Sequence, residues 1–114
     1  MTRMIYHMCP QEAWAAAVAA GRYDGTEDDQ RDGFIHFSTA EQLPQSARRH
    51  RAGQAGLVLL AVEADRLGER LRWEPSRGGA LFPHLYGALP LDAVTRVADL
   101  PLGPTGEHLF PPLV

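Results

Sequence analysis

The sequence predicts an α+β domain, and three observations support this prediction. The chain has 114 residues, of which 45% are hydrophobic and 22% are charged, an ordinary composition for one globular domain. Both segments with a helical pattern lie in the first half of the chain, and the second half consists mostly of short apolar runs separated by Gly and Pro. We therefore expect one domain over residues 1–114, with a core at about residues 4–100 and an irregular tail over residues 101–114.

The chain begins with the pattern of a strand followed by that of a helix. Residues 3–8 form a short apolar and aromatic run, which favours a buried strand. The Ala-rich run over residues 11–20 predicts a helix, which Gly21 terminates. Trp14 and Val18 lie four residues apart, so we expect both to lie on the face of this helix that packs inward.

A polar segment separates this helix from the next strand. Residues 22–32 hold five acids and hardly any apolar side chain, so we expect an exposed loop that could act as a mobile flap. Residues 33–37 restore strand character. Ser38 and Glu41 have the spacing of a capping box and predict a second helix that runs to about Arg51. Positive charge crowds the end of this helix, where it suits the helix dipole, and we expect it to be solvated.

The second half of the chain predicts four strands. Residues 57–62 form the most hydrophobic run, which we place in the middle of the core. Residues 71–74 alternate well enough for a strand that Pro75 ends. Residues 84–87 predict a further short strand, and residues 94–100 predict a last strand at an edge.

The composition argues against several classes of protein. No stretch approaches the roughly 20 consecutive apolar residues of a membrane-spanning helix, and no signal-peptide pattern is present, so we expect a cytoplasmic protein with no membrane partner. Cys9 is the only cysteine, which excludes an internal disulfide and a cysteine-based zinc site. The 11 basic residues are outnumbered by 14 acids, for a formal net charge of −3. Nucleic acid stays open as a ligand, but this charge does not favour it.

Three of the five histidines lie in predicted strands beside aromatic residues: His7, His36 and His84. A buried imidazole needs hydrogen-bond partners, and its pKa falls with desolvation, so histidine is an uncommon choice for a strand. Each of these histidines alone is compatible with a structural role. A shared chemical role requires that the three rings meet at one pocket.

Two further places could hold a ligand. Ser38 and Thr39 stand where a predicted strand gives way to a helix, and free backbone N–H groups at such a point favour a phosphate or a carboxylate. The alternative is that Ser38 only caps the helix. Trp73 and Glu74 place a large aromatic beside a carboxylate, which suits a sugar or a base, or simply a packed strand with one exposed acid.

Four blocks of the sequence resemble, in order and separation, the bacterial family catalogued as domain of unknown function 952. These blocks are residues 5–7, 33–39, 72–75 and 82–87, and the resemblance covers about residues 4–100. Members of that family are similar to the ADP-ribosyltransferase architecture, in which two small antiparallel sheets clasp a cleft that holds NAD. The resemblance therefore implies an ADP-ribosyltransferase-like fold with two helices in the N-terminal half of the chain.

The resemblance also implies roles for individual residues. His7 stands where those transferases have a first-strand histidine that contacts a ribose of NAD. His36 stands where a strand carries an aromatic that stacks on nicotinamide, and the RNA 2′-phosphotransferase branch also has a histidine there. The catalytic glutamate of the transferases has no direct counterpart in residues 82–87, and Glu74 is the candidate substitute. The candidate catalytic residues are His7, His36 and Glu74, and the candidate ligand- or cofactor-binding residues are His7, His36, Ser38, Thr39, Trp73, His84 and Tyr86.

The leading hypothesis is a cleft that binds a nucleotide or an ADP-ribose-like phosphate ligand. NAD or a related nucleotide is then the cofactor, no metal is expected, and ADP-ribosyl- or 2′-phosphotransferase-like catalysis stays open. One alternative is a zinc-dependent hydrolase in which His7, His36 and His84 ligate the metal and leave a position for water. Another is a non-catalytic ligand-sensing module that keeps the cleft without the chemistry. The sequence makes no prediction of the oligomeric state.

Overall fold

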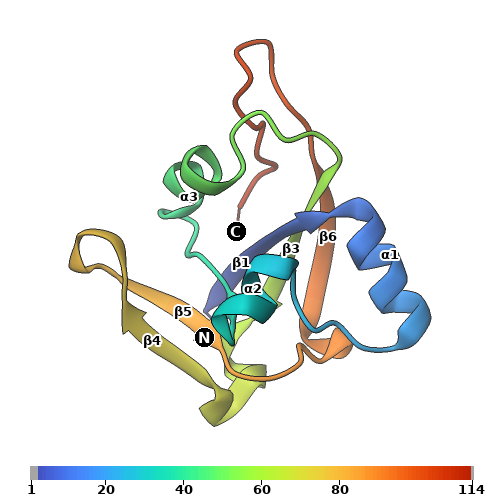
Figure 1. Ribbon diagram of the computed structural model, residues 1–114, viewed down its shortest axis with the longest axis vertical. Helices are drawn as coiled ribbons and strands as arrows, with labels where there is room; N and C mark the ends of the chain where they lie inside the picture. The colour runs from blue at the N-terminus through green and yellow to red at the C-terminus, as the bar shows by residue number, and fades with distance from the viewer. Residues whose placement is uncertain (1–2, 114) are drawn as a thin grey trace.

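The computed structural model describes residues 3–113 and contains two three-stranded antiparallel sheets (Figure 1). The first sheet has the strand order β1-β3-β6, and the second has the order β2-β5-β4. The strands are β1 (Met4–Pro10), β2 (Ile35–His36), β3 (Leu57–Glu63), β4 (Leu71–Pro75), β5 (Leu81–Leu85) and β6 (Val94–Leu100). This confirms the predicted α+β class with two small antiparallel sheets.

Helices of the described chain accompany these sheets in the N-terminal half. They are α1 (Gln11–Ala20), α2 (Glu27–Asp32) and α3 (Leu43–His50). Short 3₁₀ segments cover Ala64–Arg70, Arg77–Gly79 and Leu91–Ala93. Within residues 3–113, no helix combines the length and the hydrophobicity needed to cross a membrane. A cytoplasmic location stays a prediction.

Strands β1 and β3 of the first sheet are buried on both faces, with β3 at the centre of the sheet as predicted, whereas most of β6 is exposed. One face packs against α1 and the second sheet, and the other packs against α3 and the C-terminal segment. The first face presents Ile5, Cys9, Val58, Leu60 and Val62, and the second presents Tyr6, Met8, Leu57, Leu59 and Ala61. A strand covered on both faces needs no polar alternation, which explains the continuous apolar run over residues 57–62.

Helix α1 has the predicted bounds, and it ends at Gly21, whose φ of 76° is left-handed. Its buried face differs from the prediction. Trp14 packs against the core and Ala17 is buried, whereas Val18 is 55% exposed. Residues three apart share a helix face as well as those four apart, and here the smaller Ala17 provides the inward contact.

The expectation of an exposed loop over residues 22–32 is wrong for its second half, which forms α2. A capping box begins this helix: Asp29 N–H donates to Thr26 Oγ1 at 3.2 Å, and Thr26 N–H donates to Asp29 Oδ2 at 2.8 Å. Gly33 ends it with a φ of 89°. Helix α2 is held by a buried carboxylate and not by an apolar face, so apolar periodicity does not reveal it.

Helix α3 begins five residues after Ser38, so the capping box predicted for Ser38 and Glu41 is wrong. Thr39 and Gln42 make the reciprocal pair instead. Thr39 N–H donates to Gln42 Oε1 at 3.0 Å, and Gln42 N–H donates to Thr39 Oγ1 at 3.2 Å. The later start places Pro44 in the first turn, where a proline is tolerated.

Two strands of the second sheet differ from their predicted bounds. The strand predicted over residues 33–37 is the two-residue β2, and the one predicted over residues 84–87 is β5, which begins and ends earlier. Strand β2 is short because the chain crosses to the first sheet directly after it. Ser38 N–H donates to the Tyr6 carbonyl and Tyr6 N–H donates to the Ser38 carbonyl, each at 2.8 Å. This bridge forms a seam between the two sheets.

Candidate functional site

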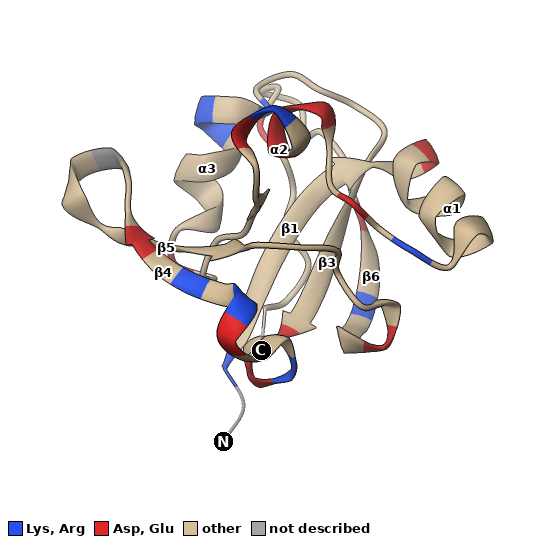
Figure 2. Ribbon diagram, turned by 60° about the horizontal axis from the view of Figure 1, so that its bottom comes forward, with Lys and Arg blue, Asp and Glu red and all other residues tan. Residues whose placement is uncertain are grey.

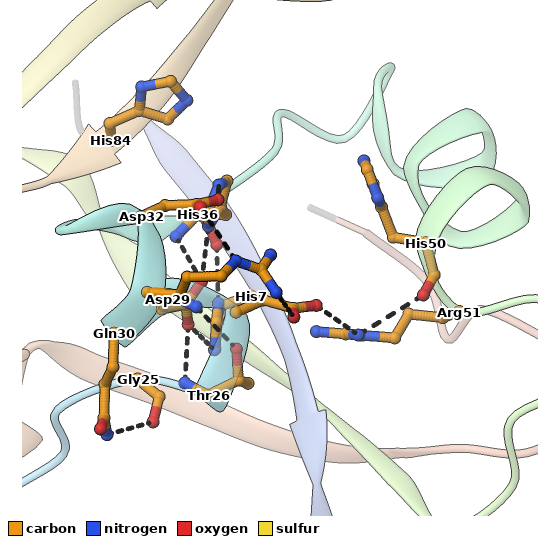
Figure 3. Close-up of polar contacts among 12 residues, drawn as sticks. His7, Gly25, Thr26, Asp29, Gln30, Asp32, His36, His50, Arg51 and His84 are labelled. Carbon is orange, nitrogen blue, oxygen red and sulfur yellow. Dashed lines mark hydrogen bonds and ion pairs between the residues drawn. The ribbon is translucent and has the colours of Figure 1, made fainter.

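A cleft of about 150 Å³ lies at this seam. Its lining comes from β1, α2, β2, α3 and β5 and includes His7, His36 and His84. The structure thus brings the three predicted histidines, from segments far apart in the sequence, to one cleft. In Figure 3, His36 and two carboxylates of α2 lie between His84 on one side and Arg51 on the other.

His7 forms a buried part of the wall, with only 3% of its surface exposed. Its Nδ1 lies 2.6 Å from the His36 carbonyl oxygen, and its Nε2 lies 2.6 Å from the Tyr23 hydroxyl. A carbonyl oxygen only accepts, so Nδ1 donates, and Nε2 of the neutral ring accepts from Tyr23. Burial lowers the pKa of His7, against the opposing effect of the Asp29 carboxylate at 3.6 Å. His7 therefore holds the seam together and offers no free nitrogen to a ligand.

Asp29 is the buried carboxylate of the site, with 2% of its surface exposed. Its Oδ1 accepts hydrogen bonds from the His36 backbone N–H at 3.2 Å and from His36 Nδ1 at 2.6 Å. Burial acts to raise the pKa of Asp29, but the hydrogen bond from His36, the nearby His7 ring and two backbone N–H groups lower it to about 2. Asp29 is ionised and connects α2 to β2.

His36 lies between two carboxylates of α2. Its Nδ1 faces Asp29, and its Nε2 lies 3.2 Å from Asp32 Oδ2. Only an imidazolium donates from both ring nitrogens at once, so this arrangement suits the charged ring. The side chains of His36 and Asp32 are 42% and 38% exposed, so their mutual contact is accessible from the cleft.

His84 forms a second pair with a carboxylate. Its Nδ1 donates to Glu74 Oε1 at 2.8 Å, and the Tyr86 hydroxyl donates to the same oxygen at 2.7 Å. These two hydrogen bonds lower the pKa of Glu74. His84 stacks on Phe34 with ring centroids 4.1 Å apart, and its centroid lies 5.6 Å from that of His36. With Nδ1 as the donor, Nε2 carries a lone pair, and none of the described residues hydrogen-bonds to it.

Arg51 reaches the cleft from the end of α3. Its Nε is buried, and among residues 3–113 nothing accepts a hydrogen bond from it. Its Nη1 lies 3.8 Å from Asp28, a carboxylate that also pairs with Arg31 at 3.0 Å. The Arg51 side chain is 16% exposed, so the expectation of a fully solvated basic helix end is wrong for this residue.

Figure 2 shows the acidic and basic residues of α2 next to one another, whereas β1 carries neither kind.

Some predicted ligand-binding residues lie outside the lining of this cleft. Thr39 caps the turn before α3, and Trp73 packs against the core with the Arg3 guanidinium 4.3 Å from its ring. Glu74 and Tyr86 lie behind His84 and reach the cleft only through it.

Ser38 does line the cleft, but it lacks the geometry predicted for an anion site. Its backbone N–H donates to Tyr6, and its hydroxyl shares a hydrogen bond of 2.9 Å with Ser46. The helix starts five residues later, so no free N–H groups of a helix N-terminus gather at Ser38.

The geometry of the cleft does not fit the zinc alternative. Both ring nitrogens of His7 have protein partners, so this residue has no lone pair for a metal. Within the described part of the chain, no three or more His, Cys, Asp or Glu side chains are grouped as a metal site.

Sequence reasoning missed Tyr23, Asp29, Asp32 and Arg51. One signal was present for Asp29, because Thr26 followed three residues later by an acid is the spacing of a capping box. The contributions of Tyr23 and Arg51 depend on contacts between distant segments, for which the sequence carries no local signal.

The fold and the site define a small α+β protein with a histidine-lined cleft at the seam of two antiparallel sheets. Residues 8–97 match the model of the family described as Protein of unknown function (DUF952), and the chain belongs to this family. The family predicted from the sequence blocks is confirmed, while the relationship to ADP-ribosyltransferases stays a prediction.

The chain is similar to protein CC0527 from Caulobacter crescentus. The comparison with the crystal structure of that protein gives 52% sequence identity, covers 93% of each chain and has a TM-score of 0.90. The solution NMR structure of CC0527 gives 53% identity, coverage of 91% of this chain and 90% of that chain, and a TM-score of 0.82. None of the curated proteins matches this chain.

Proposed function

We propose that this protein binds a nucleotide or an ADP-ribose-like phosphate compound in the cleft at the seam. The observation that carries this proposal is the guanidinium of Arg51, a residue that lines the cleft and whose buried Nε has no hydrogen-bond partner among the described residues. A buried donor left without a partner costs about 1–3 kcal/mol, and a ligand that supplies the acceptor would remove this cost. A guanidinium matches the geometry of phosphate oxygens, which makes phosphate the acceptor that we favour.

The remaining lining supports a ligand that carries a ribose beside its phosphate. His84 offers a ring lone pair at Nε2, and the contact between His36 Nε2 and the partly exposed Asp32 is accessible from the cleft, so both groups can meet sugar hydroxyls. The cleft volume of about 150 Å³ is small for a whole dinucleotide. A second hollow of about 440 Å³ adjoins it, and Asp28 and Arg51 line both. A ligand with its phosphate at Arg51 could therefore extend into the second hollow.

An ADP-ribosyltransferase-like origin of this cleft is part of the proposal. Two small antiparallel sheets, with His7 on β1 and His36 on β2, agree with what the family resemblance implies. Two roles change, however. His7 is occupied by Tyr23 and a backbone carbonyl, and Glu74 is held behind His84, so neither the ribose contact nor the carboxylate chemistry of the transferases is proposed for them.

Isothermal titration calorimetry with NAD, ADP-ribose and a 2′-phosphorylated RNA oligonucleotide tests the proposal. We expect binding of at least one of the three and a loss of affinity of about tenfold or more in Arg51→Gln, because a charge-assisted hydrogen bond is removed. Arg48→Gln is the matched control, since Arg48 lies exposed on the same helix. The proposal fails if none of the three compounds binds, or if Arg51→Gln binds as well as Arg48→Gln.

A further inference from the structure

We propose that His36 and His84 are a general acid–base pair that hydrolyses a phosphodiester in this cleft, with nucleoside 2′,3′-cyclic phosphates as the substrate class. This inference rests on the proposed function, because it requires a phosphate beside Arg51. It assigns an activity to two residues whose geometry goes beyond what binding needs.

Both rings are held in place by carboxylates from different elements. Asp29 of α2 lies 2.6 Å from Nδ1 of His36, and Glu74 of β4 lies 2.8 Å from Nδ1 of His84. A carboxylate at Nδ1 fixes the orientation of an imidazole and leaves Nε2 for the reaction. The two histidines are also directly opposite each other in the β2–β5 register, with ring centroids 5.6 Å apart. The backbone pairing thus sets their separation.

The surroundings of the two rings give them different roles. His84 donates from Nδ1, and no described residue occupies its Nε2 lone pair, which is the arrangement of a base. His36 has a carboxylate at each nitrogen, which is the arrangement of a protonated acid. The carboxylate at its Nε2 is that of the partly exposed Asp32. The other oxygen of this carboxylate, Oδ1, lies 3.4 Å from Arg31 Nε. A substrate oxygen could displace Asp32 from Nε2 without disturbing the buried Asp29.

The reaction follows from these roles. Nε2 of His84 takes a proton from a water molecule, whose oxygen forms a new bond to phosphorus. The bond between phosphorus and one ribose oxygen breaks, and Nε2–H of His36 protonates that leaving oxygen. One water is consumed, nothing is oxidised or reduced, and the product is a nucleoside phosphate monoester. Proton exchange with solvent then restores both rings.

The cleft also favours a cyclic diester over other phosphate esters. A 2′,3′-cyclic phosphate holds its phosphorus and both ester oxygens in one five-membered ring, which suits a cleft of about 150 Å³. It carries a single negative charge, and Arg51 brings one guanidinium to the lining of the cleft. The positive charge of Arg51 would stabilise the negative charge that develops on the non-bridging oxygens during attack.

The test is incubation of the purified protein with 2′,3′-cyclic AMP, followed by phosphorus NMR. We expect adenosine monophosphate to form, and kcat to fall at least about 100-fold in His84→Ala and in His36→Ala, the usual range for a general acid or base. Free imidazole should restore part of the activity of His84→Ala, which a purely structural defect would not allow. His108→Gln changes a histidine outside the cleft, whose Nε2 lies 2.8 Å from the Gln54 carbonyl oxygen, and should keep the wild-type rate.

Glu74→Gln tests a positioning residue in the same assay. The amide still accepts from His84 but no longer stabilises a charged ring, so kcat should fall while KM stays near its wild-type value. A merely structural role would instead lower stability and leave kcat per folded molecule unchanged.

Calorimetry with adenosine 3′-monophosphate, run in parallel, separates the two proposals. Binding of this nucleotide without turnover of the cyclic substrate, or turnover that survives in His84→Ala, overturns the acid–base pair and leaves the proposed function intact. Failure of the cyclic nucleotide, the monophosphate and the three compounds named above to bind overturns both.

Discussion

Replacement of Asp29 by Asn tests whether an ionised carboxylate anchors α2 to the second sheet. The pKa of Asp29 is lowered from 3.8 to about 2 in the folded protein. At 1.36 kcal/mol per pH unit, this difference corresponds to about 2 kcal/mol of folding stability at neutral pH. For a chain of this size that is a fall in Tm of roughly 8 °C. The amide also lacks a second acceptor for the donors from Thr26 and His36, so the loss should be at least this large.

The pH dependence has a defined sign. The folded-state pKa of Asp29 lies below the unfolded value, so its contribution is complete above about pH 4 and is lost as the pH falls towards 2. His7 acts in the same direction at higher pH. Burial lowers its pKa below 6.5, so the stability from the neutral ring is complete above pH 6.5 and declines on acidification. The wild-type protein and Asp29→Asn both carry His7, so the change below pH 4 in the difference between their free energies of unfolding measures the titration of Asp29.

Urea unfolding followed by circular dichroism at pH 7, 4 and 2.5 measures this difference. We expect a gap of about 2 kcal/mol at pH 7 that closes towards pH 2.5. Asp24→Asn is the control, because Asp24 is an exposed acid paired with Arg22 and its loss should cost less than about 0.5 kcal/mol. An equal gap at pH 7 and pH 2.5 would refute an ionised, hydrogen-bonded Asp29.

Two substitutions and one labelling experiment test the packing around the cleft. Tyr23→Phe leaves a buried imidazole nitrogen without its donor and should lower the free energy of unfolding by about 1–3 kcal/mol, measured by urea titration. Gly25→Ala should destabilise the protein more than Gly53→Ala in the same titration. Both glycines have positive φ, but a Cβ added at Gly25 would lie 2.7 Å from Asp29 Cβ, whereas one added at Gly53 would meet no atom within 4 Å. Cys9 is buried and burial raises its pKa, so we expect it to react with iodoacetamide at pH 8 only in urea, and rapid labelling of the native protein would contradict this.

The parts of the fold that the sequence predicts well are those with local signals. The apolar run of β3 and the Ala-rich segment closed by Gly21 give the central strand and α1 within a residue or two. The sequence did not predict helix α2, because the residue that anchors this helix is the polar Asp29, and a polar segment favours the prediction of a loop. Element type is recoverable where apolar periodicity decides it, and it is lost where one buried charge does.

The residues of the site also fall into a group that the sequence predicts and a group that it does not. The pattern of histidines in strands predicted which imidazoles matter, and the structure brings them to one cleft. Their partners were not predictable, because they depend on strand register and on the turn between α2 and β2. Glu74 reaches His84 although the β4–β5 register places it opposite Phe82, and Asp29 reaches His36 only because α2 forms.

The two carboxylate–histidine pairs differ in how closely chemistry is tied to folding. Asp29 caps α2, binds the backbone of β2, orients His36 and lies 3.6 Å from His7, so no change at this residue affects the cleft alone. The Glu74 side chain is 34% exposed, and among the side chains that the structure describes its hydrogen-bond partners are His84 and Tyr86. A loss of binding or turnover in Asp29→Asn would therefore mix stability with chemistry, whereas the same loss in Glu74→Gln would report on His84. The pair on β4 and β5 is consequently the place where activity can be changed while α2 and the seam stay intact.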